Sequence, residues 1–312
     1  MRIDFCVGVA AIAVLASSCT QPPQQPQAAQ PALAPQSQQP PPPAQQTDFS
    51  TVQVVAHALA GNVHYLEGRG GNIGVLLGSE GIVIVDDQFA PLSEKIVDAL
   101  GALSDERVRF VINTHVHPDH MGGNANFAAL GAAIVAHDNV RVRMMQGIRG
   151  GPPEPVAAWP VVTYVDKLAM HINGEEIVIV KVPSAHTDGD SYIYFRTANV
   201  LHLGDVFRTG AFPVIDTANG GTAQGTIDAL EMAIAMAGTD TIVLPGHGTP
   251  SKRADVQKFL AMLVDVEARV SALVDQGMTL EQVIAAAPAA AYTDLGSPDR
   301  FLTGLYESLT AD

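Results

Sequence analysis

The residues best suited to chemistry form a cluster of three histidines and one aspartate within six positions. They are His115, His117, Asp119 and His120. Imidazole nitrogens and carboxylate oxygens are ligands that Zn²⁺ accepts in proteins. A buried strand is expected directly before the cluster, and Pro118 forces a loop within it, so His115 and His117 can face one ion while Asp119 and His120 face a second. Because burying so many ionisable groups without a metal costs several kcal/mol each, the spacing predicts a metal site.

Three further residues occur in a similar setting, where a strand-like run is followed by a short turn that contains glycine. They are His186, Asp205 and His247. A structural zinc site closes at four ligands, whereas a catalytic site keeps an open position. The candidate ligands are more numerous than the four that a closed zinc site uses, and they are expected at the tips of loops. They therefore favour an open, dinuclear catalytic site.

The elements that must position these residues alternate between strands and helices. Hairpins are expected over 52–86, a helix with Ser93 as its N-cap over 91–103, and a strand over 108–113 that leads into the histidine cluster. The elements expected after the cluster are a helix over 124–130, a strand over 132–136, a helix from Asp138, strands over 176–182, 191–195 and 200–203, and helices over 226–237, over 255–276 and from a capping box at Thr279.

Between these elements, the Gly- and Pro-rich segment 147–155 is expected to form a mobile loop beside the cleft. The two halves each run from strands to helices. This pattern predicts an α/β fold in which two sheets pack face to face with helices outside, a four-layered αββα sandwich.

With its motifs in this order, the sequence resembles the metallo-β-lactamase superfamily. The strings THVHPDHMGGN, SAHTDGDS, HLGDVF and LPGHG carry the resemblance, together with Asp86 at the end of a strand, and it covers residues 50–270. They look most like the periplasmic quinoprotein-relay and class B β-lactamase-like branch. The resemblance implies the αββα metallo-β-lactamase fold, which holds one or two metals at the edges of its sheets.

Carried over to this sequence, the resemblance implies two zinc ions per chain. The ligands implied for the first ion are His115, His117 and His186, and those for the second are Asp119, His120 and His247. Asp205 would bridge the two ions. Asp86 would orient the ligand loop through hydrogen bonds without binding metal. Asp119 would also be the catalytic residue, because it would orient a hydroxide shared by the ions and take its proton.

The reaction expected from such a site is hydrolysis of an amide or ester carbonyl without a covalent enzyme intermediate. The substrate stays open among β-lactams, thioesters of the glyoxalase II type and lactones. Asp205 stands where some β-lactamases of this fold use a cysteine ligand. An aspartate at this position is the pattern of the broader dinuclear hydrolases. An envelope location suits β-lactams and suits cytosolic glutathione thioesters poorly. An envelope lipoprotein that merely binds metal is the alternative from another functional class.

Composition excludes several other functions. The chain has 17 Lys and Arg against 32 Asp and Glu, a net charge of −15, which argues against a nucleic-acid partner. Its two cysteines, Cys6 and Cys19, both lie near the start. The body therefore has no disulfide framework and no cysteine nucleophile. The expected partner is a small-molecule carbonyl substrate, and the sequence leaves the oligomeric state open.

Three segments are expected along the chain. Residues 1–19 read as a lipoprotein-type signal peptide, because a twelve-residue apolar run over 5–16 is too short to span a bilayer and ends just before Cys19. Residues 20–46 contain 9 Pro, 10 Gln and 5 Ala and no charge, so they read as a disordered tether. The catalytic domain is expected over 47–312. This order predicts a periplasmic or envelope location with a lipid on Cys19 as the only membrane attachment; secretion is the alternative.

Overall fold

A computed structural model describes residues 48–311 of the chain. The signal segment predicted over 1–19 and the tether predicted over 20–46 lie outside these residues. Among residues 48–311, none of the helices combines the length and the apolar character that a membrane crossing requires.

The first sheet has seven strands in sequence order, and its parallel half is joined through helices. The strands are β1 (Val55–Ala60), β2 (Val63–Glu67), β3 (Ile73–Leu76), β4 (Ile82–Val85), β5 (Val108–Ile112), β6 (Ala133–His137) and β7 (Val162–Tyr164). Strands β1 to β4 pair antiparallel, as the predicted hairpins require, and β4 to β7 pair parallel. The helices of this half are α1 (Ser93–Gly101), α2 (Pro118–Met121), α3 (Asn124–Ala129) and α4 (Asp138–Gln146).

The second sheet has six strands in the order β13-β12-β11-β10-β9-β8. Their bounds are β8 (Lys167–Ile172), β9 (Glu175–Lys181), β10 (Ser191–Phe195), β11 (Val200–His202), β12 (Ile242–Leu244) and β13 (Ser251–Lys252). Only β11 and β12 pair parallel in this sheet. Its helices are α5 (Ala223–Met236), α6 (Arg253–Asp275), α7 (Leu280–Ala285) and α8 (Asp299–Thr310). Short 3₁₀ turns complete the chain: η1 (Ala90–Leu92), η2 (Ile148–Gly150), η3 (Val156–Ala158), η4 (Gly204–Val206), η5 (Thr217–Asn219) and η6 (Thr293–Leu295).

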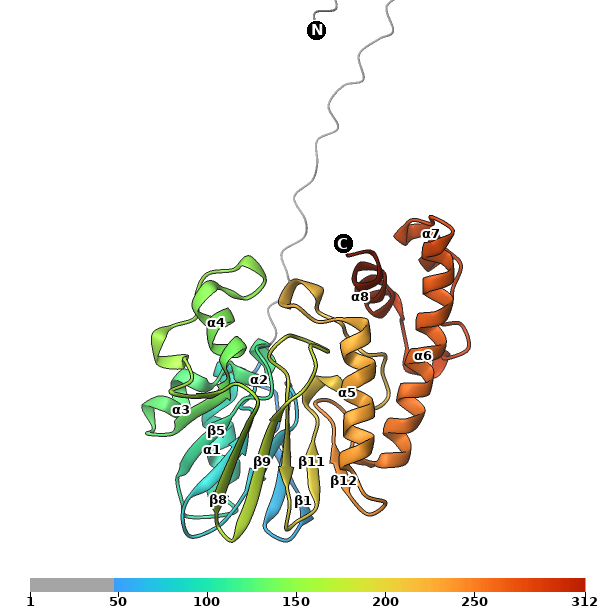
Figure 1. The fold of residues 1–312 in the computed structure, drawn as a ribbon. Coiled ribbons are helices and arrows are strands. Elements are labelled where there is room, and N and C mark those ends of the chain that lie inside the picture. Colours follow the sequence, from blue (N-terminus) through green and yellow to red (C-terminus); the bar gives the residue numbers. More distant parts are fainter. Residues whose placement is uncertain (1–47, 312) are drawn as a thin grey trace, which may run out of the picture. The chain divides into compact units, whose positions relative to one another are not determined.

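Alternation along the strands sorts the side chains into layers, because successive residues of a strand point to opposite faces of its sheet. In β4, Val85 packs with Ile193 of β10 in the core between the sheets, whereas Ile84 packs with Ile96 of α1 on the outer face. In β10, Tyr192 points the other way, and its hydroxyl donates to the backbone oxygen of Ala229 in α5. Figure 1 shows α5, α6 and α8 beside the second sheet. The predicted αββα sandwich is therefore confirmed.

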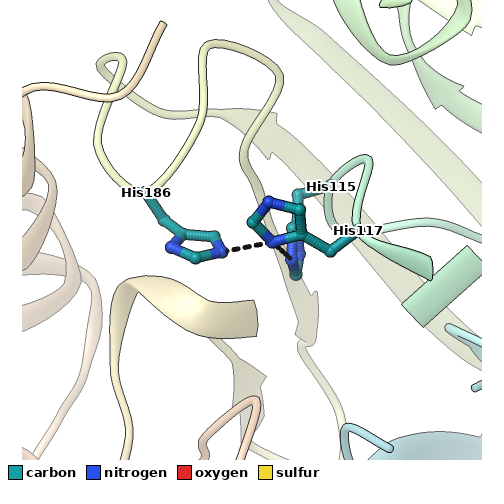
Figure 2. Close-up of side chains that lie close together, drawn as sticks. All are labelled: His115, His117 and His186. Atoms are coloured by element: carbon teal, nitrogen blue, oxygen red, sulfur yellow. Dashed lines mark hydrogen bonds between the residues drawn. The ribbon is translucent and has the colours of Figure 1, made fainter. Parts of the chain in front are cut away.

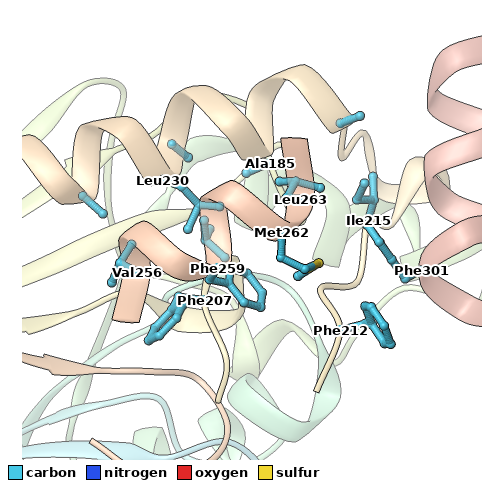
Figure 3. Close-up of a cluster of buried hydrophobic side chains, with 14 of the residues drawn as sticks. Ala185, Phe207, Phe212, Ile215, Leu230, Val256, Phe259, Met262, Leu263 and Phe301 are labelled. Atoms are coloured by element: carbon cyan, nitrogen blue, oxygen red, sulfur yellow. The ribbon is translucent and has the colours of Figure 1, made fainter. Parts of the chain in front are cut away.

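Helices α5, α6 and α8 share one apolar core with the second sheet (Figure 3). The stripe predicted along α6 is buried there: Phe259 packs edge-on against Phe207 with 5.2 Å between ring centroids, and Leu263 is fully enclosed. Phe301 of α8 stacks on Phe212 at 5.5 Å. Burying each such side chain contributes about 1.5–3 kcal/mol. These contacts hold α8 against the segment that follows Phe212.

The ends of two helices test the predicted caps. Ser93 is not an N-cap, because the 3₁₀ turn η1 starts at Ala90 and runs directly into α1, so Ser93 is already helical. Its hydroxyl instead accepts a hydrogen bond from the side-chain amide of Asn126. The capping box at Thr279 is confirmed, since the Thr279 hydroxyl accepts from the Gln282 amide and the Gln282 side chain accepts from Thr279 in return.

Candidate metal centre

The ligand candidates come from loops and short helical turns at one edge of the two sheets. Asp119 and His120 lie in α2, because Pro118 starts a helix there and does not force the expected loop. His115 follows β5, which is parallel to β4, and Asp205 and His247 follow the parallel pair β11 and β12. His186 lies in the loop after β9, and β9 runs in the same direction as β11 because both are antiparallel to β10. The carboxyl ends of strands that run the same way meet at one edge of a sheet, so residues far apart in sequence come together.

The first cluster brings three imidazole nitrogens together (Figure 2). The Nδ1 atom of His117 lies 3.1 Å from Nε2 of His115 and 2.7 Å from Nε2 of His186. All three residues are buried. They are the residues predicted to hold the first ion, and the structure places one nitrogen of each at a common point.

The second nitrogen of each ring faces an acceptor outside the cluster. Nδ1 of His186 lies 2.6 Å from the backbone oxygen of Val214, and Nε2 of His117 lies 2.6 Å from Oδ2 of Asp216. Nδ1 of His115 lies 2.9 Å from the Thr114 hydroxyl, whose own hydrogen goes to a carboxylate. Each outer nitrogen therefore carries the hydrogen.

This tautomer pattern leaves a lone pair on every nitrogen that faces the centre of the cluster. Nδ1 of His117 and Nε2 of His186 lie 2.7 Å apart. With a lone pair on each atom they cannot form a hydrogen bond, and they repel each other unless a cation lies between them. Burial is the main cause that lowers the pKa of His186 to about 3, and burial lowers the pKa of His115 well below its usual value. Both are therefore neutral imidazoles, the form that binds metals.

The second cluster joins Asp119, His120 and His247. Nε2 of His247 lies 3.2 Å from Nε2 of His120 and 3.3 Å from Oδ2 of Asp119. Asp205 lies between the clusters: its Oδ1 is 3.1 Å from Nε2 of His120, and its Oδ2 is 3.7 Å from Nε2 of His186. The structure thus brings together all seven predicted ligands, in the two groups expected and with Asp205 shared.

The second cluster gathers opposite charges in a largely buried site. Burial disfavours charge on His120, yet Asp205 and Asp86 raise its pKa well above the usual value. Burial also opposes charge on Asp205, but His120 and His247 hold its pKa well below the ordinary range. Within residues 48–311, the buried Oδ1 of Asp205 has no hydrogen-bond donor. Imidazole nitrogens and carboxylate oxygens match the ligand chemistry of zinc, so these residues fit such an ion.

Asp86 holds the ligand loop from behind. It is fully buried and has a φ of 66°, a strained value for a residue with a side chain. Its Oδ1 accepts from the Thr114 amide and its Oδ2 from the Thr114 hydroxyl and from Nδ1 of His120. Although Asp86 also lies near His115 and His120 in a possible ligand group, its oxygens face the outer side of the His120 ring. These contacts place Asp86 behind the ligand loop, where the resemblance implies an orienting role.

Two glycines leave the space that the clusters occupy. A Cβ atom on Gly71 would overlap the His120 ring, and one on Gly246 would overlap Oδ1 of Asp205. Gly71 and Gly246 are also tied to the site through their backbones, since the Gly71 amide donates to Asp119 and the Gly246 amide to Gly204. The close approach of these backbones explains why the chain needs glycine at both positions.

Sequence reasoning did not find the loop over residues 212–219, which carries acceptors for two histidines. Its Val214 oxygen and Asp216 carboxylate fix the rings of His186 and His117. Asp216 also accepts from Arg149 and Asn219, and together with His117 these donors lower its pKa against the opposing effect of burial. No motif marks Asp216, because a single aspartate in a loop has no characteristic spacing to other candidate residues.

Helix α8 supports the same loop. Besides the Phe212–Phe301 stack, the Thr217 hydroxyl donates to Glu307 at 2.6 Å, and Gly304 approaches the Ile215 backbone too closely for a side chain. The loop that orients two ligand histidines is thus held in place by a helix distant in sequence.

The predicted loop over 147–155 lies beside the site and contributes Arg149. This residue has a φ of 51° and binds Asp216 through Nε at 2.8 Å and Nη2 at 2.6 Å. Since Nε2 of His117 donates to Asp216, the 3.3 Å approach of Arg149 to that nitrogen is a contact without a shared hydrogen. A cleft of about 180 Å³ opens beside the clusters, and its lining includes His117, Asp119 and Arg149.

Comparisons with known proteins agree with this geometry. A model described as "Metallo-beta-lactamase superfamily" matches residues 66–247. The alpha subunit of a 2,4-dinitroanisole O-demethylase from Nocardioides sp. (strain JS1661) is 27% identical over 135 residues, 43% of this chain and 40% of that protein. A hydroxyacylglutathione hydrolase from Anaeromyxobacter dehalogenans (strain 2CP-C) is 30% identical over 111 residues, 35% of this chain and 43% of that protein. The chain thus spans less than half the length of either curated relative.

A solved structure extends the comparison to the whole fold. A metallo-beta-lactamase from Pontibacter korlensis superimposes with a TM-score of 0.61 at 16% identity, covering 68% of this chain and 100% of that one. At this identity the likeness shows the shared fold. The family match covers more than half of the chain and includes all seven predicted ligands, from His115 to His247. The chain belongs to the metallo-β-lactamase superfamily.

Proposed function

We propose that this protein is a dinuclear zinc-dependent hydrolase that cleaves an amide or ester carbonyl. The superfamily consists mostly of hydrolases, and the His and Asp clusters of this chain can hold metal. One observation carries the proposal of two ions. Outer hydrogen bonds orient His115, His117, His186 and His120, so that their inner nitrogen atoms gather at two points on either side of Asp205.

The residues of the chain would divide the work as follows. Zinc, when bound, would supply Lewis acidity that polarises the carbonyl and activates water. Asp119 borders the cleft with 30% of its side chain exposed, so it can reach a substrate. Burial opposes its charge, but the hydrogen bond with His247 and the charge of His120 lower its pKa, so Asp119 is a carboxylate at neutral pH and can orient an attacking water as a hydrogen-bond acceptor. Asp216, Val214 and Asp86 keep the histidine rings fixed while this happens.

The substrate within this class is the finer part of the proposal. A cyclic amide of the β-lactam type is the first candidate, since it is the substrate that an envelope location favours. A thioester or lactone is the second, because the ligand between the clusters is Asp205 and because one relative is named a hydroxyacylglutathione hydrolase. We also propose, from the sequence alone, a periplasmic or envelope location with a lipid on Cys19.

Metal analysis combined with turnover tests the proposal. Untagged protein is assayed by plasma mass spectrometry for zinc per chain, and then with nitrocefin, S-lactoylglutathione and an acyl-homoserine lactone, with and without EDTA. We expect about two zinc ions and turnover that EDTA abolishes. His117→Ala should abolish turnover, whereas the matched control His171→Ala, at an exposed position on β8, should not.

The outcomes separate the functional classes. Protein that binds zinc and turns over none of the three substrates would favour the metal-binding lipoprotein. Turnover that survives both EDTA and His117→Ala would refute metal-dependent hydrolysis. Thioester turnover without nitrocefin turnover would select the second candidate.

A further inference from the structure

His202 is a fully buried histidine that belongs to neither ligand cluster. It ends strand β11, shortly before Asp205, and none of its surface is exposed. A buried imidazole has two ring nitrogens, and burying either of them without a hydrogen-bond partner is costly. The partners of His202 therefore show what the residue does.

Both ring nitrogens of His202 contact backbone groups near the metal centre. Nδ1 accepts from the Gly204 amide at 3.1 Å, and Nε2 lies 3.1 Å from the backbone oxygen of Asn72. An amide N–H can only donate, so Nδ1 carries no hydrogen and the ring hydrogen is on Nε2. His202 thus accepts from the residue directly before Asp205 and donates to Asn72, in the loop between β2 and β3.

Asn72 in turn holds the loop that carries His247. Its amide donates to the Gly246 oxygen at 2.7 Å, and its side-chain Nδ2 donates to the oxygens of Pro245 at 3.0 Å and of Gly248 at 2.8 Å. These three oxygens flank His247 in the chain. Asn72 is buried, so the bonds are sheltered from water. The backbone on both sides of His247 is therefore fixed by one residue.

The two turns complete a closed circuit of four hydrogen bonds. The last of these bonds runs from the Gly246 amide to the Gly204 oxygen at 2.7 Å. Each of the four residues donates one bond to the next and accepts one; in order of donation they are His202, Asn72, Gly246 and Gly204. Because all four bonds run in the same direction, each polarises the next. His202 contributes the only side chain to this circuit.

The circuit joins two turns that carry ligands of the second metal site. Gly204 directly precedes Asp205, and Gly246 directly precedes His247. The histidines of the first cluster are oriented by other acceptors, and none of them adjoins a member of the circuit in sequence. A change in the circuit should therefore act on the second ion more than on the first.

We infer that His202 is a positioning residue for the second metal site: through the circuit it sets the Asp205 turn against the His247 loop, so that both ligands are in place before an ion binds. Without its ring, the buried Gly204 amide and the buried Asn72 oxygen lose their partners, and both turns can move. The inference rests on the proposed dinuclear zinc site. It adds a residue that is not a ligand and that favours one ion over the other.

Variants of His202 test the inference through zinc affinity. His202→Phe keeps an aromatic ring without either bond, whereas His202→Asn can keep the bond from Gly204 and His202→Gln the bond to Asn72. Zinc binding to metal-free protein is measured by competition with a chromogenic chelator, and His247→Ala identifies the step that belongs to the second cluster. We expect His202→Phe to weaken that step by about 10- to 100-fold and to leave the other within about twofold. His202→Asn and His202→Gln should fall between it and wild type, and they carry the test if His202→Phe does not fold.

Tyr192→Phe is the matched control. Tyr192 is also fully buried, on the neighbouring strand β10, and its hydroxyl donates to the Ala229 oxygen of α5 and not to a ligand turn. This variant should leave both zinc-binding steps unchanged. A loss spread equally over both steps in His202→Phe, or the same loss in Tyr192→Phe, would show a general effect on stability and overturn the inference.

Hydrogen exchange separates the inference from the proposed function, because it needs no zinc. Mass spectrometry of EDTA-treated protein follows the amides of segments 203–207 and 245–249. His202→Phe should speed exchange in both by about tenfold and leave segment 213–217, which orients the first cluster, unchanged. If wild type binds fewer than two zinc ions but exchange speeds up, the dinuclear proposal fails and the positioning role stands. If two ions bind and His202→Phe changes neither exchange nor affinity, the positioning role is refuted and the dinuclear site stands.

Discussion

Replacing Asp216 by Asn tests whether the hydrogen bonds behind the ligands set metal affinity. A single oxygen of Asp216 accepts from His117 at 2.6 Å, from Arg149 and from Asn219. Asn has nearly the same shape, so its amide oxygen can occupy this position, but without the charge. The result expected is a weaker zinc site in a folded protein.

The magnitude follows from the contacts that lose their charge. Charge-assisted hydrogen bonds contribute about 1.5–3 kcal/mol, roughly twice the value of neutral ones, and about 1.4 kcal/mol corresponds to tenfold in affinity. If the amide turns its NH₂ group toward His117, the ring must move its hydrogen to Nδ1, the atom that faces the cluster. We therefore expect Asp216→Asn to weaken one of the two zinc-binding steps by about 10- to 100-fold.

The assay is competition for zinc against a chromogenic chelator at constant pH, with unfolding monitored in parallel. Asp188→Asn is the matched control, because Asp188 holds Arg143 through two bonds of 2.7 Å but contacts none of the ligand histidines. Zinc affinity within twofold of wild type in Asp216→Asn, or an equal loss in Asp188→Asn, would refute the reasoning.

Three further predictions concern the site and its surroundings. Gly246→Ala should abolish zinc retention at the second cluster, measured as zinc per chain after dialysis, because its Cβ would overlap Asp205; Gly101→Ala, with open space around it, is the control and should retain zinc. EDTA should lower the midpoint of thermal unfolding, measured by calorimetry, because it leaves the lone pairs of His117 and His186 facing each other; an unchanged midpoint would contradict this. Burial raises the pKa of Asp190 to about 7, so the folded protein keeps a proton that the unfolded chain loses near 3.8, and stability falls as pH rises between those values. In zinc-free protein, the free energy of unfolding of Asp190→Asn relative to wild type should therefore rise by about 3 kcal/mol from pH 5 to pH 8 in urea titrations, and a constant difference would refute the assignment.

The sequence predicts those parts of the site that depend on local spacing. The cluster from His115 to His120 is compact, and strand-like apolar runs precede His186, Asp205 and His247. The αββα layering could be anticipated because each half runs from strands to helices and the motifs follow the order of a known family. Local signals fail where a neighbouring element decides, as at Ser93, which a preceding 3₁₀ turn draws into the helix.

The residues that the sequence does not reveal act through contacts between distant segments. Asp216 lies 99 positions from His117, and nothing around it in the sequence indicates that the two side chains meet. Arg300 borders the cleft because packing such as the stack of Phe301 on Phe212 fixes α8 in place. Such pairings depend on how the outer helices pack, which alternation within one strand or helix does not encode.

The packing of α8 has a consequence for how such a protein can diverge. The helix carries Arg300 into the cleft and also holds, through Phe301 and Glu307, the loop that orients two ligand histidines. Substitutions in this one surface helix can therefore alter the wall of the cleft and the support of the ligand loop together, while every candidate ligand stays the same. A change of the cleft that arises in α8 must also keep the ligand loop in place.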